Sequence, residues 1–163
     1  MIIRRAEEKD IDDLLEIYNY EVLNGVATFD VNPATKEERL SWLRNHNIKN
    51  HPLYVAQIDG KVAGYASLSE FRSKSAYDET VELSVYISPD YIRHGIADSL
   101  VKHIIEAARA DDNIHSIISV ITGENEASIR LHEKYGFTYC GTLKEAGTKF
   151  GRWLDVVYYQ LFV

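Results

Sequence analysis

The stretch "VYISPDYIRHGIADSL", residues 85–100, constrains the fold most, because an apolar strand pattern changes there into an amphipathic helix pattern. Arg93, His94 and Gly95 stand at the junction, after Pro89. The first N–H groups of a helix lack partners within the helix, and the helix dipole makes that end weakly positive. Glycine lets the main chain approach a ligand closely, so the junction suits a diphosphate. An ordinary strand–helix turn with one glycine would have the same pattern.

Apolar periodicity divides the whole chain into strand and helix patterns. It predicts one mixed α/β domain over residues 1–163, in the order β-α-α-β-β-β-α-β-α-β-β. Antiparallel hairpins are expected in the first half and a helical crossover in the second. The predicted strands are residues 2–5, 53–58, 61–69, 81–87, 116–123, 137–143 and 154–162. The predicted helices are residues 11–23, a second helix from 36, a third from the junction to about 110, and 125–135.

Several boundaries carry recognisable capping and turn residues. Asp10 stands where an N-cap is expected, and Thr35 and Glu38 have the spacing of a capping box. The pair Asp59-Gly60 separates two alternating runs and predicts a tight hairpin of the I′ type. Gly136 is expected to end the fourth helix.

Composition and charge exclude several function classes. The chain has 163 residues, 45% of them hydrophobic, which is enough for one buried core. A net charge of −7 and a pI of about 5.3 argue against a nucleic-acid partner. Cys140 is the only cysteine, so neither an internal disulfide nor a cysteine metal cage is expected. The charged N-terminus and the lack of a long apolar run predict a cytoplasmic protein without a membrane partner.

Two motifs resemble those of the GNAT superfamily, the acetyl-CoA-dependent N-acetyltransferases. The segment "VYISPDYIRHGIA" is similar to its motif A, with Gly95 and Ala97 in the last two motif positions and Ile92 where Gln or Arg is usual. The segment "NEASIRLHEKYGF", residues 125–137, is similar to its motif B. The resemblance implies the GNAT fold, a twisted, mostly antiparallel sheet of about seven strands with about four helices. It also implies acetyl-CoA as the co-substrate, and no metal.

The resemblance also implies how acetyl-CoA is held. The central strand would splay from its neighbour, and the pantetheine arm would pair with its exposed edge. Asn125 would contact that arm, and Ser128 would lie near the phosphates, although a helix N-cap and its first turn would have the same sequence. The implied cofactor-binding residues are Leu83, Val85, Tyr86, Ile87, Arg93, His94, Gly95, Ile96, Ala97, Asp98, Asn125 and Ser128.

A narrower resemblance covers nearly the whole chain. The segments "AYDETVELSVYISP" (76–89) and "EAGTKFGRWLDVVYYQLFV" (145–163) are similar to those of phosphinothricin N-acetyltransferases and related amino-acid-analogue acetyltransferases. The resemblance implies a small acceptor whose α-amine attacks acetyl-CoA directly, and a homodimer. Arginine suits a substrate carboxylate. The implied substrate-binding residues are Phe29, Arg72, Lys74, Tyr77 and Lys149, with Trp153 either closing the site or packing in the core.

Two residues are candidates for proton transfer. Glu82 lies in the strand "VELSVYI", on the face opposite Leu83 and Val85, and a desolvated site would raise its pKa toward that of a useful base. His132 stands where many GNAT enzymes have a tyrosine acid, and it would protonate the thiolate or relay the amine's proton. The plainer interpretation of Glu82 is a strand-end carboxylate in solvent or in a salt bridge, and that of His132 is a histidine on the helix surface.

Other functions stay open at the level of the sequence. A GNAT enzyme could acetylate a protein N-terminus or a polyamine. A non-catalytic sensor would bind acyl-CoA without turnover, and a plain interaction domain would not bind it. Cys140 lies in an apolar strand pattern and is interpreted as structural, so no acyl-enzyme is expected.

Overall fold

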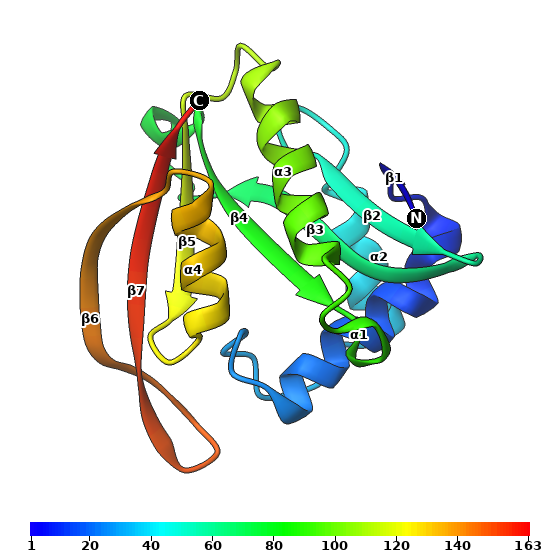
Figure 1. The fold of residues 1–163 in the computed structure, drawn as a ribbon, viewed down its shortest axis with the longest axis horizontal. Coiled ribbons are helices and arrows are strands. Elements are labelled where there is room, and N and C mark those ends of the chain that lie inside the picture. Colours follow the sequence, from blue (N-terminus) through cyan, green and yellow to red (C-terminus); the bar gives the residue numbers. More distant parts are fainter.

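The computed structural model describes all 163 residues and places seven strands in one sheet, in the order β1-β2-β3-β4-β5-β7-β6 (Figure 1). Every pair of neighbouring strands is antiparallel except β4 and β5, so the predicted mixed, mostly antiparallel sheet is confirmed. The strands are β1 (Ile2–Arg5), β2 (Leu53–Ile58), β3 (Lys61–Glu70), β4 (Thr80–Ile87), β5 (Ser116–Thr122), β6 (Thr138–Lys149) and β7 (Arg152–Phe162). The helices are α1 (Ile11–Asn24), α2 (Lys36–Arg44), α3 (Ile96–Arg109) and α4 (Glu126–Lys134).

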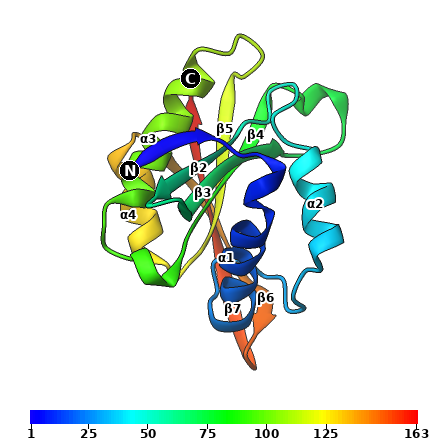
Figure 2. The ribbon, with the colours of Figure 1, turned by 90° about the vertical axis from the view of Figure 1, so that its right-hand side faces the viewer.

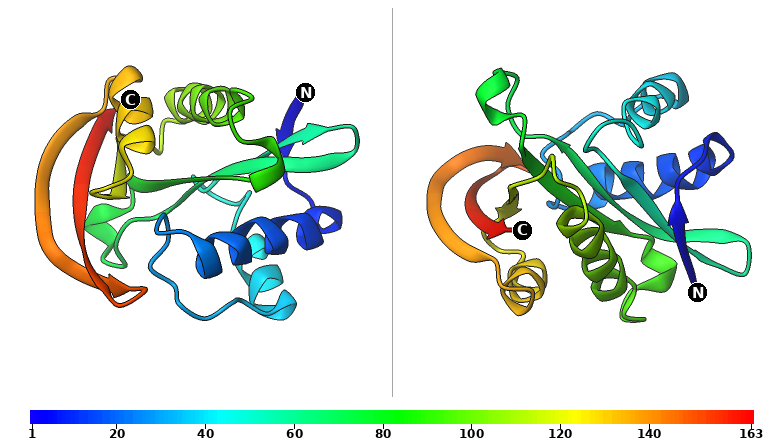
Figure 3. Two further views of the ribbon diagram at one scale, coloured as in Figure 1. Left: turned by 60° about the horizontal axis from the view of Figure 1, so that its bottom comes forward. Right: turned by 90° about the horizontal axis from the view of Figure 1, so that it is seen from above.

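Helices cover both faces of the sheet. Helices α3 and α4 lie on one face, and α1 and α2 lie on the other (Figures 2 and 3). The larger core cluster lies on the α3 side, where Leu100, Ile104 and Ala108 form the predicted apolar stripe. A smaller cluster joins α1 and α2 to β2 and β3. None of the helices has both the length and the apolar composition that a membrane crossing requires.

Strands β4 and β5 pair along only a short part of their length. Their parallel register runs from Thr80–Ser116 to Glu82–Ile118, whereas β4 pairs with β3 as far as Ile87. Figure 1 shows the two strands diverging from their common upper end. The main chain of β4 after Glu82 therefore has no partner strand on its β5 side.

Most of the predicted local signals are confirmed. Thr35 Oγ1 accepts a hydrogen bond from the Glu38 N–H at 3.1 Å, and Glu38 Oε2 accepts one from the Thr35 N–H at 3.0 Å. Asp59 and Gly60 both have positive φ angles, 48° and 85°, as a type I′ turn requires. Gly136, with a φ of 87°, follows the end of α4.

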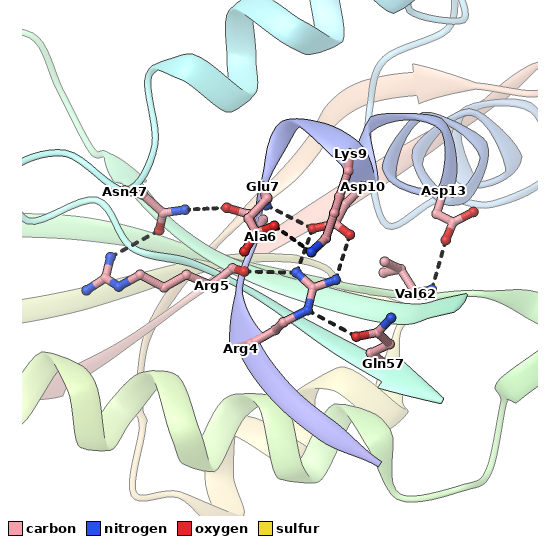
Figure 4. A network of polar contacts seen from close by, with 10 residues as sticks. All are labelled: Arg4, Arg5, Ala6, Glu7, Lys9, Asp10, Asp13, Asn47, Gln57 and Val62. Carbon is pink, nitrogen blue, oxygen red and sulfur yellow. Dashed lines mark hydrogen bonds and ion pairs between the residues drawn. The ribbon is translucent and has the colours of Figure 1, made fainter. Parts of the chain in front are cut away.

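Asp10 stands at the start of α1, but its side chain does not cap that helix. It is only 5% exposed and accepts hydrogen bonds from Arg4 at 2.7 and 2.8 Å and from the Glu7 N–H at 2.8 Å (Figure 4). Arg4 also donates to Gln57 Oε1 at 3.1 Å. Burial alone would raise the pKa of Asp10, but the bonds from Arg4 and Glu7 lower it overall. The network therefore joins β1 to β2 and to the entry of α1.

Removing the Asp10 carboxylate is expected to destabilise the fold. Asp10→Ala leaves Arg4 without its bidentate partner, so we expect the free energy of unfolding to fall by about 2 kcal/mol. Urea denaturation at pH 7 measures this loss. Asp12→Ala is the control, because Asp12 lies in the same helical turn and its ion pair with Lys36 is exposed. A similar loss in both variants would contradict the assignment of this stability to the Arg4–Asp10 pair.

The last hairpin is longer than the sequence predicts. Strand β6 continues to Lys149 through an irregularity between Leu143 and Gly147, and the hairpin extends past the body of the sheet (Figure 1). Because β6 is an edge strand, an apolar pattern on it does not imply burial. The structural interpretation of Cys140 is therefore wrong, since this side chain is exposed. A core position for Trp153 is also wrong, because Trp153 is 65% exposed.

Candidate active site

The β4–α3 junction presents free main-chain donors. Gly95 is the N-cap of α3 and has a φ of 71°, in the left-handed region that favours glycine. The N–H groups from Arg93 to Ala97 have no acceptor within the protein. No atom lies within 4 Å of where a Gly95 Cβ would stand, and Arg93 and His94 are exposed. The junction therefore has open space, free donors and two basic side chains, which together suit an anionic group.

Several side chains near the junction are engaged elsewhere. Ile96 is buried in the core, and the Asp98 carboxylate is bonded to Lys134. That bond from Lys134 lowers the pKa of Asp98. Ile92, in the position where Gln or Arg is usual, is exposed. Of Ile96 and Asp98, only the main-chain N–H groups remain for a ligand.

The side chains of β4 alternate as predicted. Leu83 belongs to the core cluster on the α3 side, and Val85 packs against that cluster. Ile87 packs there too, whereas the Tyr86 ring lies on the other face against Tyr65. Any contact between these four residues and a ligand at the free edge of β4 would therefore run through the main chain.

Glu82 lies in a small cavity on the α1 face. We name this space, of about 180 Å³, the Glu82 cavity; it is lined by Ala27, Phe29, Glu82, Val120, Thr122 and Val156. Burial raises the pKa of the Glu82 carboxyl, with no opposing charge nearby. Glu82 is therefore partly buried rather than fully solvated.

The sequence predicted Glu82 and Phe29 in this neighbourhood but missed the residues from β5 and β7. Val120 and Thr122 are two residues apart on β5, so strand alternation alone places them on one face. Their position opposite Phe29 depends on the tertiary fold.

The loop that carries Phe29 is held at several points; we name residues 25–35 the Phe29 loop. Lys149 is 4% exposed, and its Nζ donates to the main-chain oxygens of Thr28 at 2.9 Å and Glu21 at 3.3 Å. Thr122 Oγ1 donates to the Val26 oxygen. A Cβ on Gly147 would lie 2.4 Å from the Phe29 ring, so only glycine fits there without displacing that ring. Lys149 thus contacts the loop and lies outside the Glu82 cavity.

The other residues that were predicted to bind the acceptor substrate lie apart from Glu82. Arg72, Lys74 and Tyr77 line a separate cavity of about 370 Å³ in the β3–β4 loop. The Arg72 guanidinium lies 5.1 Å from the Phe71 ring centre, and the Phe71 and Tyr77 rings are 5.8 Å apart. One chain therefore does not bring these cations into the Glu82 cavity.

Helix α4 carries the second motif. Asn125 Oδ1 accepts a hydrogen bond from the Ser128 N–H at 3.2 Å, which is an N-cap. His132 is 2% exposed, so a surface position for it is wrong. Its Nδ1 donates to the Ser128 oxygen at 2.7 Å, and its Nε2 is buried without a partner. Burial lowers the pKa of His132, although the bond to Ser128 opposes this shift, so the ring is neutral at pH 7 with a free lone pair on Nε2.

No group of three or more histidine, cysteine, aspartate or glutamate side chains is arranged to hold a metal ion.

Sequence comparisons identify related proteins over nearly the whole chain. The family model described as "Acetyltransferase (GNAT) domain" matches residues 3–158. Phosphinothricin N-acetyltransferase of Streptomyces coelicolor is 37% identical over 97% of this chain and 94% of the relative. L-methionine sulfoximine/L-methionine sulfone acetyltransferase of Salmonella typhimurium is 37% identical over 99% of this chain and 94% of the relative. L-amino acid N-acyltransferase MnaT of Escherichia coli is 36% identical over 99% of this chain and 93% of the relative.

Solved structures share the fold. A phosphinothricin acetyltransferase from Sinorhizobium meliloti in complex with acetyl-CoA superposes with a TM-score of 0.96, at 36% identity over 99% of this chain and 88% of the other. A ribosomal-protein-alanine N-acetyltransferase from Brucella melitensis has a TM-score of 0.96, at 41% identity over 100% of both chains.

Proposed function

Because the chain belongs to the GNAT acetyltransferase family, we propose that it transfers acetyl from acetyl-CoA to the α-amine of a small amino-acid analogue. One observation carries this proposal most: Glu82 lies in a small, partly apolar cavity at the point where β4 and β5 separate. A carboxylate of raised pKa there is suited to accept a proton from an amine.

Acetyl-CoA fits the features of this chain. We propose that the N–H groups from Arg93 to Ala97 bind the diphosphate, with Arg93 adding positive charge and the His94 side chain beside it. The pantetheine arm would then pair with the free edge of β4 after Glu82. The unpartnered Nε2 of His132 is a buried polar atom that a ligand in this position could satisfy. Asn125 and Ser128 begin the same helix and would lie beside the arm.

The proposed reaction is a direct attack within a ternary complex. Glu82 takes a proton from the substrate ammonium, and the free amine attacks the thioester carbonyl carbon. A main-chain N–H of β4, at Leu83 or Val85, donates to the developing oxyanion. The attacking nitrogen loses its second proton and the C–S bond breaks, which leaves the acetylated amine and the thiolate of coenzyme A; the thiolate takes up one proton.

His132 is proposed to relay a proton. Its neutral ring carries the hydrogen on Nδ1, where it donates to Ser128, so Nε2 presents a lone pair. A neutral ring is not at first an acid for the thiolate. It can accept a proton as the amine loses one and then pass it to sulfur.

The acceptor is proposed to use the Glu82 cavity for its amine and side chain, with Phe29 closing over it. Its carboxylate would be bound by Arg72 or Lys74, with Tyr77 beside them. Since these cations lie outside the cavity of their own chain, we propose that the protein is a homodimer in which two loops complete the sites. We also propose that it acts in the cytoplasm.

An acceptor screen tests the proposed function. Purified protein, acetyl-CoA and a thiol-release readout are combined with phosphinothricin, methionine sulfone, methionine sulfoximine, standard amino acids, polyamines and peptides. We expect turnover with the first three and none with peptides. Turnover with peptides only would contradict the proposed acceptor class, and acetyl-CoA binding without any turnover would favour a sensor.

Acetylation of a protein N-terminus is the second candidate. It is favoured by the likeness to the protein from Brucella melitensis that is named a ribosomal-protein-alanine N-acetyltransferase. A peptide acceptor needs room for residues beyond the first. The Glu82 cavity of about 180 Å³, which Ala27 and Phe29 of the Phe29 loop help to line, is better matched to a small acceptor.

A further inference from the structure

Arg39 is a buried cation that neither motif explains. It lies on α2, is 4% exposed, and forms no ion pair. Its Nη2 donates to the Tyr65 hydroxyl at 2.5 Å, while its Nε is buried without a partner. A buried charge without a counter-ion is costly for the fold, so its surroundings must stabilise it in another way.

Aromatic rings surround the Arg39 guanidinium. Its central carbon lies 3.4 Å from the ring centre of Trp42, 4.3 Å from that of Tyr18 and 5.2 Å from that of Tyr65. Cations over aromatic faces are attracted by the ring quadrupole, most strongly when both are desolvated. We name Arg39, Trp42, Tyr18 and Tyr65 the Arg39 cage. The cage joins α2 to α1 and β3 on the face of the sheet that bears Glu82.

One member of the cage reaches the Phe29 loop. The Tyr18 hydroxyl donates to the Asp30 carboxylate and lies 3.3 Å from Thr28 Oγ1. Thr28 Oγ1 also accepts from the Asp30 N–H at 3.2 Å. Thr28 and Asp30 are the two neighbours of Phe29, which lines the Glu82 cavity. The Tyr18 hydroxyl is therefore one of the anchors of the loop, and it is the one that bonds both neighbours of Phe29.

A second contact leads from the cage to β4. The Tyr65 ring lies 5.3 Å from that of Tyr86, and Tyr18 meets Tyr86 edge to face at 5.7 Å. Tyr86 is four residues after Glu82 on the same strand, so both side chains lie on the same face. The Arg39 cage thus contacts both the Phe29 loop and strand β4, and each of these contributes a residue to the lining of the Glu82 cavity.

We propose that Arg39 is a positioning residue for the acceptor: through Tyr18 it holds the Phe29 loop in the position that shapes the Glu82 cavity. Arg39 itself does not touch the acceptor. The kinetic consequence of this proposal rests on the function proposed above. The effect of Arg39 on the position of the Phe29 loop does not.

Steady-state kinetics with both substrates test the proposal. Arg39→Met removes the cation and Tyr18→Phe removes only the hydroxyl that bonds the loop. Both are expected to raise the KM of the acceptor about tenfold and to leave the KM of acetyl-CoA within about twofold of wild type. Arg39→Lys keeps a cation over the rings and should recover part of the loss. Arg44→Met is the control, since Arg44 lies on the same helix, exposed and paired with Glu8.

Hydrogen exchange of the loop tests the same proposal without an acceptor. The Ala27 N–H bonds to Glu21 Oε1 at 2.9 Å and the Asp30 N–H to Thr28 Oγ1. In Arg39→Met and Tyr18→Phe these amides should exchange about tenfold faster than in wild type and Arg44→Met. Faster exchange without turnover of any acceptor by wild type would uphold the role of Arg39 and refute the proposed function. Unchanged exchange in folded Tyr18→Phe, or an acceptor KM equal to that of wild type, would overturn the role of Arg39.

Discussion

Glu82→Gln is expected to lower kcat about 10²–10³-fold while the affinity for acetyl-CoA stays within about twofold, because the amide cannot accept the amine's proton. Glutamine has nearly the same shape, so the Glu82 cavity should keep its lining. Single-turnover kinetics with saturating acetyl-CoA and the acceptor found by the screen measure the loss. Glu79→Gln is the control, since Glu79 is an exposed carboxylate just before the same strand.

The pH dependence should support the same assignment. Because burial raises the pKa of Glu82, kcat/KM of the wild type should rise with pH through that raised pKa, and Glu82→Gln should lose this acidic limb. Retention of the acidic limb and of most activity in Glu82→Gln would show that another group, or water, is the base.

Loss of folding can be separated from loss of catalysis. A carboxyl with a raised pKa binds its proton more tightly in the folded state, so its contribution to stability is fully present below the unfolded pKa of about 4.3. That contribution is lost as the pH rises through the folded pKa. At pH 7 the charged, partly buried Glu82 therefore costs stability, and the melting temperature of Glu82→Gln should equal or exceed that of wild type.

Gly95→Val is expected to weaken acetyl-CoA binding about 10–100-fold, because a β-branched residue cannot adopt the left-handed conformation without strain. Relief of that strain would turn the N–H groups from Arg93 to Ala97 away from the ligand. Titration calorimetry with acetyl-CoA measures the change.

Gly60→Val is a matched control for this substitution. Gly60 also has a positive φ, 85°, and no atom within 4 Å of an added Cβ, but it lies in the β2–β3 turn. The Gly60→Val variant should lose about as much stability as Gly95→Val but keep the wild-type affinity for acetyl-CoA. Equal weakening in both variants would assign the effect to general destabilisation.

The parts of the fold that depend on local pattern were predictable. The alternation of "VELSVYI" placed Glu82 opposite Leu83, and the structure has them on opposite faces. The hairpin at Asp59-Gly60 and the capping box at Thr35 follow from residues a few positions apart. Such signals are complete within one segment of sequence.

The errors concern surfaces that a local pattern cannot assign. Cys140 follows an apolar alternation, but β6 is the last strand of the sheet and no layer covers it. Asp10 has the residue type of a cap, yet the nearby Arg4 offers a stronger, charged partner. Arg39 gave no signal, because its cage combines residues of α1, α2 and β3.

The site was predictable only in part for the same reason. Gly95 and Asn125 belong to motifs in which neighbouring residues carry the signal. The contact of Phe29 with Gly147 joins residues more than one hundred positions apart, and only the tertiary fold brings them together.

A crystal structure with bound acetyl-CoA tests the central claim most directly. The account predicts the diphosphate within about 3 Å of the N–H groups from Arg93 to Ala97, with the arm along β4 and the thioester beside Glu82. A diphosphate bound elsewhere, or a thioester that ends outside the reach of Glu82, would contradict it.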